Sequence, residues 1–188
     1  HDVPNAWLDV VVTSSTSFRQ HVWGEFYLGS TDLALFTGHV VNKVDRKGRV
    51  SVPASFRNEL TKLSFPGIVA FPSPEGLPAI HGAGIDWLEN LSANFGTANP
   101  FAPKLPKSRM ALFGQVERLG FDPEGRVILS RGLMEHAGIS DAAEFIGMGD
   151  TFQIWQPEAG AARRDEAIAG ASDEFDSVAR NRTPGDER

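Results

Sequence analysis

The sequence predicts a mainly β protein with short helices, in the α+β class, built from two internal repeats. The pattern Asp-x-x-Gly-Arg followed by alternating apolar residues occurs twice, beginning at Asp45 and at Asp122. Each copy is followed by a short helical pattern and then by two apolar segments of strand length. The chain has 188 residues, of which 41% are hydrophobic, so it can form one globular domain or two small ones.

The first repeat is predicted over residues 35–93. Val40–Val44 forms a strand that leads into the Asp-x-x-Gly turn, where Asp can accept hydrogen bonds from nearby amides and Gly can adopt a positive φ. Val50 and Val52 alternate with polar residues, which is the period of a half-buried strand. Pro53 suits the first turn of a helix, where its missing N–H is not needed. That helix carries Phe56 and Leu60 on one face, and strands over 68–71 and 77–81 and a helical segment over 85–92 follow it.

The second repeat is predicted over residues 109–170 and has the same order of elements. Leu133 and Ala137 lie on one face of a short helix that ends at Gly138. Two strands over 144–147 and 152–155 and a helical segment over 157–168 complete this unit. The duplication predicts that both halves share one type of local fold.

Two further segments lie outside the repeats. Residues 94–108 contain Pro100, Pro103 and Pro106, so we expect an extended Pro-rich linker between the repeats. Residues 171–188 are charged and lack aliphatic anchors, so we expect a disordered tail there.

Composition excludes several classes of function. The chain has no cysteine, which excludes disulfides, thiolate zinc sites, iron–sulfur clusters and cysteine nucleophiles. The histidines at 39, 81 and 136 form no metal-ligand spacing, so we expect no metal and no cofactor. Gly82-Ala83-Gly84 is too short for a phosphate cradle, and we expect no small-molecule substrate. No apolar run approaches the roughly 18 to 20 residues that cross a bilayer, so we expect no membrane partner.

Positive charge is concentrated in two blocks although the formal net charge is -6. Residues 37–62 hold six basic side chains against two acidic ones, and residues 104–131 hold six against three. Each block is a candidate nucleic-acid surface, because binding to phosphates depends largely on Lys and Arg. The alternative interpretation is a solvated, charged face without a partner.

Several stretches of the two repeats carry a family resemblance. In the first repeat these are Phe36-x-Gly38 and Asp45-x-Lys47-Gly48-Arg49-Val50-x-Val52-Pro53-x-x-Phe56-Arg57-x-x-Leu60. In the second they are Asp122-x-x-Gly125-Arg126-Val127-x-Leu129, His136-Ala137-Gly138 and Phe152-x-Ile154-Trp155. Together they resemble the MraZ family of bacterial transcriptional regulators, which is related in fold to AbrB. The similarity covers roughly residues 35–160.

The resemblance implies a double swapped-hairpin β-barrel, in which the two repeats interleave their hairpins in one core. It implies a non-enzymatic, sequence-specific transcriptional regulator whose partners are double-stranded DNA and further copies of itself in a homo-oligomeric ring. Members of the family similarly bind direct repeats containing TGGG upstream of their own cell-division and cell-wall operon. We expect this protein to repress such an operon, in the cytoplasm and on the nucleoid.

The family's DNA-contacting Asp-x-x-x-Arg motif carries over onto Asp45 and Arg49, and onto Asp122 and Arg126. The second copy departs from the first, with Pro123 and Glu124 in place of Arg46 and Lys47, Ser130 in place of Pro53, and Met134 in place of Arg57. We therefore expect the first loop to contact DNA more strongly than the second.

The chemistry of the first loop suggests separate roles for its residues. Arg49 offers a planar fork of donors that can pair with guanine O6 and N7, or with a phosphate. Arg46 and Lys47 at the tip are expected to hold phosphates. Asp45 is expected to orient Arg49, since a carboxylate facing a phosphate would repel it. The alternative is that Asp45 and Arg49 form only a salt bridge that stabilises their own turn.

Two other classes of function fit parts of the sequence. Duplicated aspartates suggest an aspartic protease, but that dyad needs small Asp-Thr-Gly or Asp-Ser-Gly loops, which Asp45-Arg46 and Asp122-Pro123 do not provide. The remaining alternative is a non-enzymatic, ring-forming structural or protein-interaction module. Among the other conspicuous residues, Trp87, Phe152 and Trp155 are expected in the core, and Arg163 and Arg164 on a solvated helix face.

Residues 1–34 have no counterpart in the second repeat. The resemblance begins at Phe36, and family members similarly start with Met-Phe. One hypothesis is that translation natively begins at Leu35, which TTG or CTG can encode, so that residues 1–34 are translated upstream DNA. Trp23-Gly24 would then be encoded as TGG followed by GGN, which places one TGGG before the start. The alternative is a genuine N-terminal extension with a strand over 6–12 that packs on the barrel.

Overall fold

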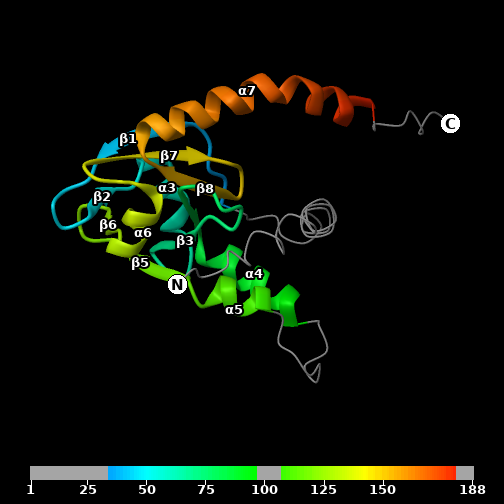
Figure 1. Ribbon diagram of the computed structural model, residues 1–188. Coiled ribbons are helices and arrows are strands. Elements are labelled where there is room, and N and C mark those ends of the chain that lie inside the picture. Colours follow the sequence, from blue (N-terminus) through cyan, green and yellow to red (C-terminus); the bar gives the residue numbers. More distant parts are fainter. Residues whose placement is uncertain (1–33, 97–106, 181–188) are drawn as a thin grey trace, which may run out of the picture. The chain divides into compact units, whose positions relative to one another are not determined.

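The computed structural model describes residues 34–96 and 107–180 (Figure 1). Its strands are β1 (His39–Lys43), β2 (Arg49–Ser51), β3 (Gly67–Pro72), β4 (Ala79–Ala83), β5 (Glu117–Gly120), β6 (Arg126–Ile128), β7 (Ala142–Gly147) and β8 (Thr151–Trp155). Its helices are α3 (Ala54–Leu60), α4 (Ile85–Gly96), α5 (Lys107–Phe113), α6 (Arg131–Ala137) and α7 (Pro157–Arg180). One antiparallel sheet has the order β1-β7-β8-β4-β3-β5, and β2 and β6 form a second, two-stranded sheet. This architecture confirms the predicted α+β class.

The strands of the two repeats are interleaved. β1 of the first repeat pairs with β7 of the second, with Val41 opposite Glu144. In the same way β2 pairs with β6, β3 with β5, and β4 with β8. Only the β3–β4 and β7–β8 pairs join strands of one repeat within the described residues. Each repeat therefore completes the sheet of the other, as the swapped-hairpin resemblance implies.

One hydrophobic core is shared by both repeats. Phe36 and Phe56 meet edge-on with ring centroids 5.2 Å apart, and Phe152 of the second repeat lies 5.0 Å from Phe36. Phe56 and Leu60, predicted to share one face of α3, are both buried there. In α6, Leu133 is buried at the equivalent position. Burying an aliphatic or aromatic side chain of this size contributes about 1.5 to 3 kcal/mol, so the core fixes both helices against the sheet.

Aromatic residues cover the opposite face of the six-stranded sheet. Trp87 of α4 stacks on Phe71 of β3, with ring centroids 5.9 Å apart, and His81 of β4 lies 4.9 Å from Phe71. Trp155 of β8 is also buried, and its Nε1 donates to Gln153. The core positions expected for Trp155 and Phe152 are confirmed. His81 is buried, and desolvation lowers the pKa of its imidazole to about 4.

Helix ends follow the predicted chemistry only in part. Pro53 was expected in the first turn of a helix, but it precedes α3 as its N-cap residue, with φ -50° and ψ 140°. The Ser130 side chain accepts a hydrogen bond from the N–H of Leu133 and so caps the start of α6. Gly138 adopts a left-handed conformation with φ 64° and ends that helix, as the sequence predicts.

The linker and the tail differ from the sequence prediction. α4 continues to Gly96 and α5 begins at Lys107, so both ends of the predicted 94–108 linker are helical. α7 passes its predicted end at Ile168 and continues to Arg180, so residues 171–180 are helical rather than part of a disordered tail. Residues such as Ala, Glu and Arg favour helix without aliphatic anchors, and a helix that has already formed propagates readily. The strand proposed over 6–12 and the tail beyond Arg180 lie outside the described residues.

α7 packs on β7 and β8 (Figure 1) and is held there by a buried ion pair. Arg164 Nη2 lies 3.0 Å from Oε1 of Glu144, whose side chain is 1% exposed. His39 Nδ1 lies 3.1 Å from the same oxygen. A Cβ on Gly160 would collide with the Glu144 carboxylate, so this glycine lets the helix approach the strand. The prediction of a solvated face was therefore wrong for Arg164, whereas Arg163 pairs with an exposed glutamate.

Candidate functional site

The first Asp-x-x-Gly-Arg turn leads from β1 into β2 and is organised by Asp45. Its Oδ1 accepts hydrogen bonds from the backbone N–H groups of Lys47 (2.8 Å) and Arg49 (3.0 Å), and its Oδ2 accepts from Arg49 Nε at 2.5 Å. Gly48 adopts φ 77°, a conformation that other residues rarely tolerate. These bonds, led by the one from the Arg49 N–H, lower the pKa of the Asp45 carboxyl, which is therefore ionised at neutral pH.

The second turn, before β6, repeats this arrangement. Asp122 Oδ1 accepts from the backbone N–H groups of Glu124 (3.0 Å) and Arg126 (2.8 Å), and Oδ2 accepts from Arg126 Nε at 2.7 Å. Gly125 adopts φ 74°. Desolvation acts to raise the pKa of the Asp122 carboxyl, but the bonds from Arg126 outweigh it and the net shift is downward. The turn chemistry predicted from the sequence is thus present in both repeats.

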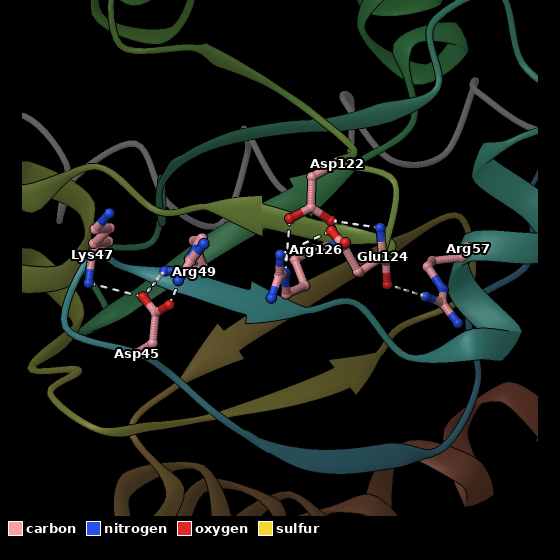
Figure 2. A network of polar contacts seen from close by, with 7 residues as sticks. All are labelled: Asp45, Lys47, Arg49, Arg57, Asp122, Glu124 and Arg126. Atoms are coloured by element: carbon pink, nitrogen blue, oxygen red, sulfur yellow. Dashed lines mark hydrogen bonds and ion pairs between the residues drawn. The ribbon is translucent and has the colours of Figure 1, made fainter.

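The β2–β6 ribbon places the two turns at its opposite ends. Arg49 lies opposite Ile128, and Ser51 lies opposite Arg126. The residue between them on each strand is a valine that is buried in the core. All four flanking residues are exposed or half-buried, so both arginines lie on one outer face of a two-stranded ribbon (Figure 2). A ribbon of this kind fits the major groove of B-DNA.

The two arginines have different partners. Within the described residues, the Arg49 side chain bonds only to Asp45, through Nε, and both of its terminal nitrogens remain available. Arg126 donates from Nε to Asp122 and also from Nη2 to Glu124 Oε2, at 2.9 Å. The bond to Asp122 is the largest of the effects that raise the pKa of the Arg126 guanidinium. Arg126 is thus held by two carboxylates and Arg49 by one.

The tips of the turns also differ. Arg46 and Lys47 are exposed at the tip of the first turn and line a surface hollow together with Arg131 of α6. The equivalent positions of the second turn are occupied by Pro123 and Glu124. All six residues singled out from the sequence lie on this ribbon and its turns, namely Asp45, Arg46, Lys47, Arg49, Asp122 and Arg126. The first end of the ribbon is therefore basic, whereas the residues of the second turn itself carry a net negative charge.

Arg57 also belongs to the site, although sequence reasoning did not assign it there. It lies on α3 of the first repeat, and its Nη1 donates to the backbone carbonyl of Glu124 in the second turn, at 3.1 Å. A Cβ on Gly125 would collide with the Arg57 guanidinium. In the sequence, Arg57 appears only as part of the Phe56-Arg57 pair of the family resemblance. No local pattern connects it with Glu124, which lies 67 positions further along the chain.

The described residues contain no group of three or more His, Asp or Glu side chains that could hold a metal ion. None of the helices in the two described ranges is both long and apolar enough to cross a membrane.

Comparisons with known proteins agree with one another. The family model described as "MraZ protein, putative antitoxin-like" matches residues 112–162. The chain is 41% identical over 125 residues to the transcriptional regulator MraZ of Pelagibacter ubique (strain HTCC1062), a match that covers 66% of this chain and 80% of that protein. It is 42% identical over 124 residues to the transcriptional regulator MraZ of Rickettsia akari (strain Hartford), covering 66% and 83%. The MraZ protein of Rickettsia bellii (strain OSU 85-389) is 44% identical over 117 residues, covering 62% and 77%.

Proposed function

Because this chain belongs to the MraZ family, we propose that it is a transcriptional regulator that binds specific sequences in double-stranded DNA. The observation that carries the proposal is the β2–β6 ribbon, which presents Arg49 and Arg126 on one outer face between two turns. The relatives are named transcriptional regulators, which is not an enzymatic activity, so the protein is not an enzyme.

Arg49 reads bases in this proposal. Its two terminal nitrogens can pair with guanine O6 and N7 in the major groove, a contact that discriminates by about 1 to 3 kcal/mol. Asp45 occupies only Nε and so fixes the direction of the guanidinium without blocking it. The salt bridge between the two residues therefore stabilises the turn and orients the arginine at the same time.

Arg46 and Lys47 contact phosphates and set the register of the ribbon on the duplex. Their exposed position at the tip of the first turn supports this role. Arg126 makes the weaker contact of the two arginines, because Glu124 competes with DNA for its Nη2.

The proposed targets are direct repeats containing TGGG upstream of the protein's own cell-division and cell-wall operon. A run of guanines suits readout by arginine. The proposed effect is repression, in the cytoplasm and on the nucleoid. One ribbon offers few contacts, so the protein is proposed to act as a homo-oligomeric ring in which several ribbons bind evenly spaced repeats and gain affinity through multivalency.

The decisive experiment is a titration of the purified protein against a duplex with four TGGG repeats, a duplex with one repeat and a scrambled duplex. The four-repeat duplex should bind best, the single repeat much more weakly, and the scrambled duplex only at low salt. Equal affinity for all three would exclude sequence-specific binding. Ring assembly without any DNA binding would favour the structural or protein-interaction module, and light scattering that shows only monomer would exclude the ring.

A further inference from the structure

We propose that Arg57 is the phosphate-contacting residue of the second turn, supplied by α3 of the first repeat to a turn without basic residues at its tip. This inference rests on the proposed DNA-binding function. It extends the binding surface to a helix that lies outside both Asp-x-x-Gly-Arg motifs.

The second turn has an unfavourable charge balance for binding DNA. Its tip carries Pro123 and Glu124, and its one arginine, Arg126, is paired with two carboxylates. Without a further cation, this end of the ribbon would carry a net negative charge and would repel the backbone of a duplex lying along it. A cation near the second turn would remove that repulsion.

Arg57 lies against the second turn. Its Nη1 donates to the carbonyl oxygen of Glu124, a neutral acceptor, so the bond fixes the guanidinium without neutralising its charge. Within the described ranges, no carboxylate forms an ion pair with Arg57. The side chain is half-buried and lines a surface hollow with Asn58, Thr61 and the second turn. Arg57 is thus an oriented cation next to other polar groups. Its Nη1 is used by the bond to Glu124, and the other guanidinium nitrogens can contact a phosphate.

The two halves place different helix side chains behind their turns. Met134 of α6 stands where Arg57 stands in α3, and its sulfur would lie 3.3 Å from a Cβ placed on Gly48. The first turn, with basic residues at its own tip, is therefore backed by an apolar side chain. The second turn, with an acidic tip, is backed by a cation. The positive charge thus lies at the tip of the first turn, but on the helix behind the second turn. Both turns nevertheless lie against a helix in the same way.

The basic side chains are arranged in order along the ribbon. In Figure 2 the labelled side chains follow one another from Lys47 at one end, past Arg49 and Arg126, to Arg57 at the other. A duplex that follows this line would meet a cation at each end of the ribbon. Arg57 would then do for the second turn what Lys47 does for the first.

The test is Arg57→Met, which installs the residue found at the equivalent position of α6. Each phosphate contact contributes about -0.9 to the slope of log K against log salt, which is about eightfold in affinity at 0.1 M relative to 1 M salt. The slope measured for the variant should be less negative by about 0.9 for each protomer bound to the duplex. Arg57→Lys keeps the charge and should retain most of the slope. The matched control is Arg163→Met, which removes an arginine from α7 and should leave the slope unchanged.

Thermal unfolding of each variant distinguishes a phosphate contact made by Arg57 from a purely structural role of this residue. A lower slope with an unchanged melting temperature supports the proposal, and an unchanged slope overturns it. If Arg57→Met unfolds, modification of wild-type arginines by phenylglyoxal with and without the duplex decides, because bound DNA should protect Arg57 and not Arg163. Equal modification of Arg57 in both conditions overturns the proposal. If the wild type itself binds no DNA, the proposed function fails. If the wild type binds DNA and the slope does not depend on Arg57, only the proposed role of Arg57 fails.

Discussion

Arg49 and Arg126 stand on the same face of the β2–β6 ribbon, and Glu124 engages only the second of them. The two residues come from equivalent positions of the repeats and make the same bond to their own aspartate. The difference between them therefore comes from one carboxylate at the tip of the second turn. This difference leaves both terminal nitrogens of Arg49 available and occupies one of those of Arg126.

Arg49→Ala should weaken binding to the repeat-containing duplex more than Arg126→Ala. The first variant loses a guanidinium whose terminal nitrogens are available for a base, and we expect a loss of about 1 to 3 kcal/mol for each engaged protomer. The second loses a guanidinium already shared between two carboxylates, and its loss should be clearly smaller. Fluorescence anisotropy at fixed salt measures both. Equal losses would show that the two turns read DNA alike.

Glu124→Gln should strengthen DNA binding. The change removes a negative charge and weakens the bond that holds Arg126 Nη2, so the salt slope should become more negative by about 0.9 for each protomer. The gain should disappear in the double variant with Arg126→Ala, because the guanidinium is then absent. A gain that survives in the double variant would mean that only the removed negative charge matters.

Arg164→Met should destabilise the fold by about 3 kcal/mol, since it leaves the buried carboxylate of Glu144, on β7, without its main cation. Urea unfolding measures the change. Arg163→Met, at the neighbouring exposed position, should stay within about 0.5 kcal/mol of wild type. Adding Glu144→Gln to Arg164→Met should recover part of the loss. Similar effects of the two arginine changes would contradict the buried ion pair.

The buried imidazole of His81 should make stability depend on pH below neutrality. Its pKa is lowered from 6.5 to about 4 in the folded state, so the unfolded state binds the proton more readily. The contribution is fully present above pH 6.5 and is lost as the pH falls toward 4, where the loss reaches about 3 kcal/mol. Unfolding free energies of wild type and His81→Phe between pH 4 and 7 test this. The variant should show a shallower decline, and parallel curves would contradict the assignment.

Local features of this fold could be predicted from the sequence. The two turns follow from an aspartate that can bind amides and a glycine that can adopt positive φ, at Gly48 and Gly125. The buried face of α3 follows from the four-residue spacing of Phe56 and Leu60. Such features depend on neighbours along the chain, so a short stretch of sequence contains all the information.

Contacts between distant segments could not be predicted in this way. Arg164 lies in a segment rich in alanine and acidic residues, and only the packing of α7 on β7 brings it to Glu144. Arg57 reaches Glu124 only because β2 pairs with β6 and so places α3 of one repeat beside the turn of the other. The two motifs of the candidate site could therefore be identified from the sequence, while Arg57, which contacts the second motif from α3, required the structure.

Because their strands are interleaved, the two repeats are held together by strand pairing as well as by the peptide connection between them. Within residues 34–96 and 107–180, four strand pairs join the halves, namely β1–β7, β2–β6, β3–β5 and β4–β8. A chain cut between Gly96 and Lys107 would therefore yield two fragments, neither of which holds a finished sheet, although together they contain all the strand pairs described above. The two fragments should fold only when they associate. The folded fraction of one fragment should therefore rise with the concentration of the other.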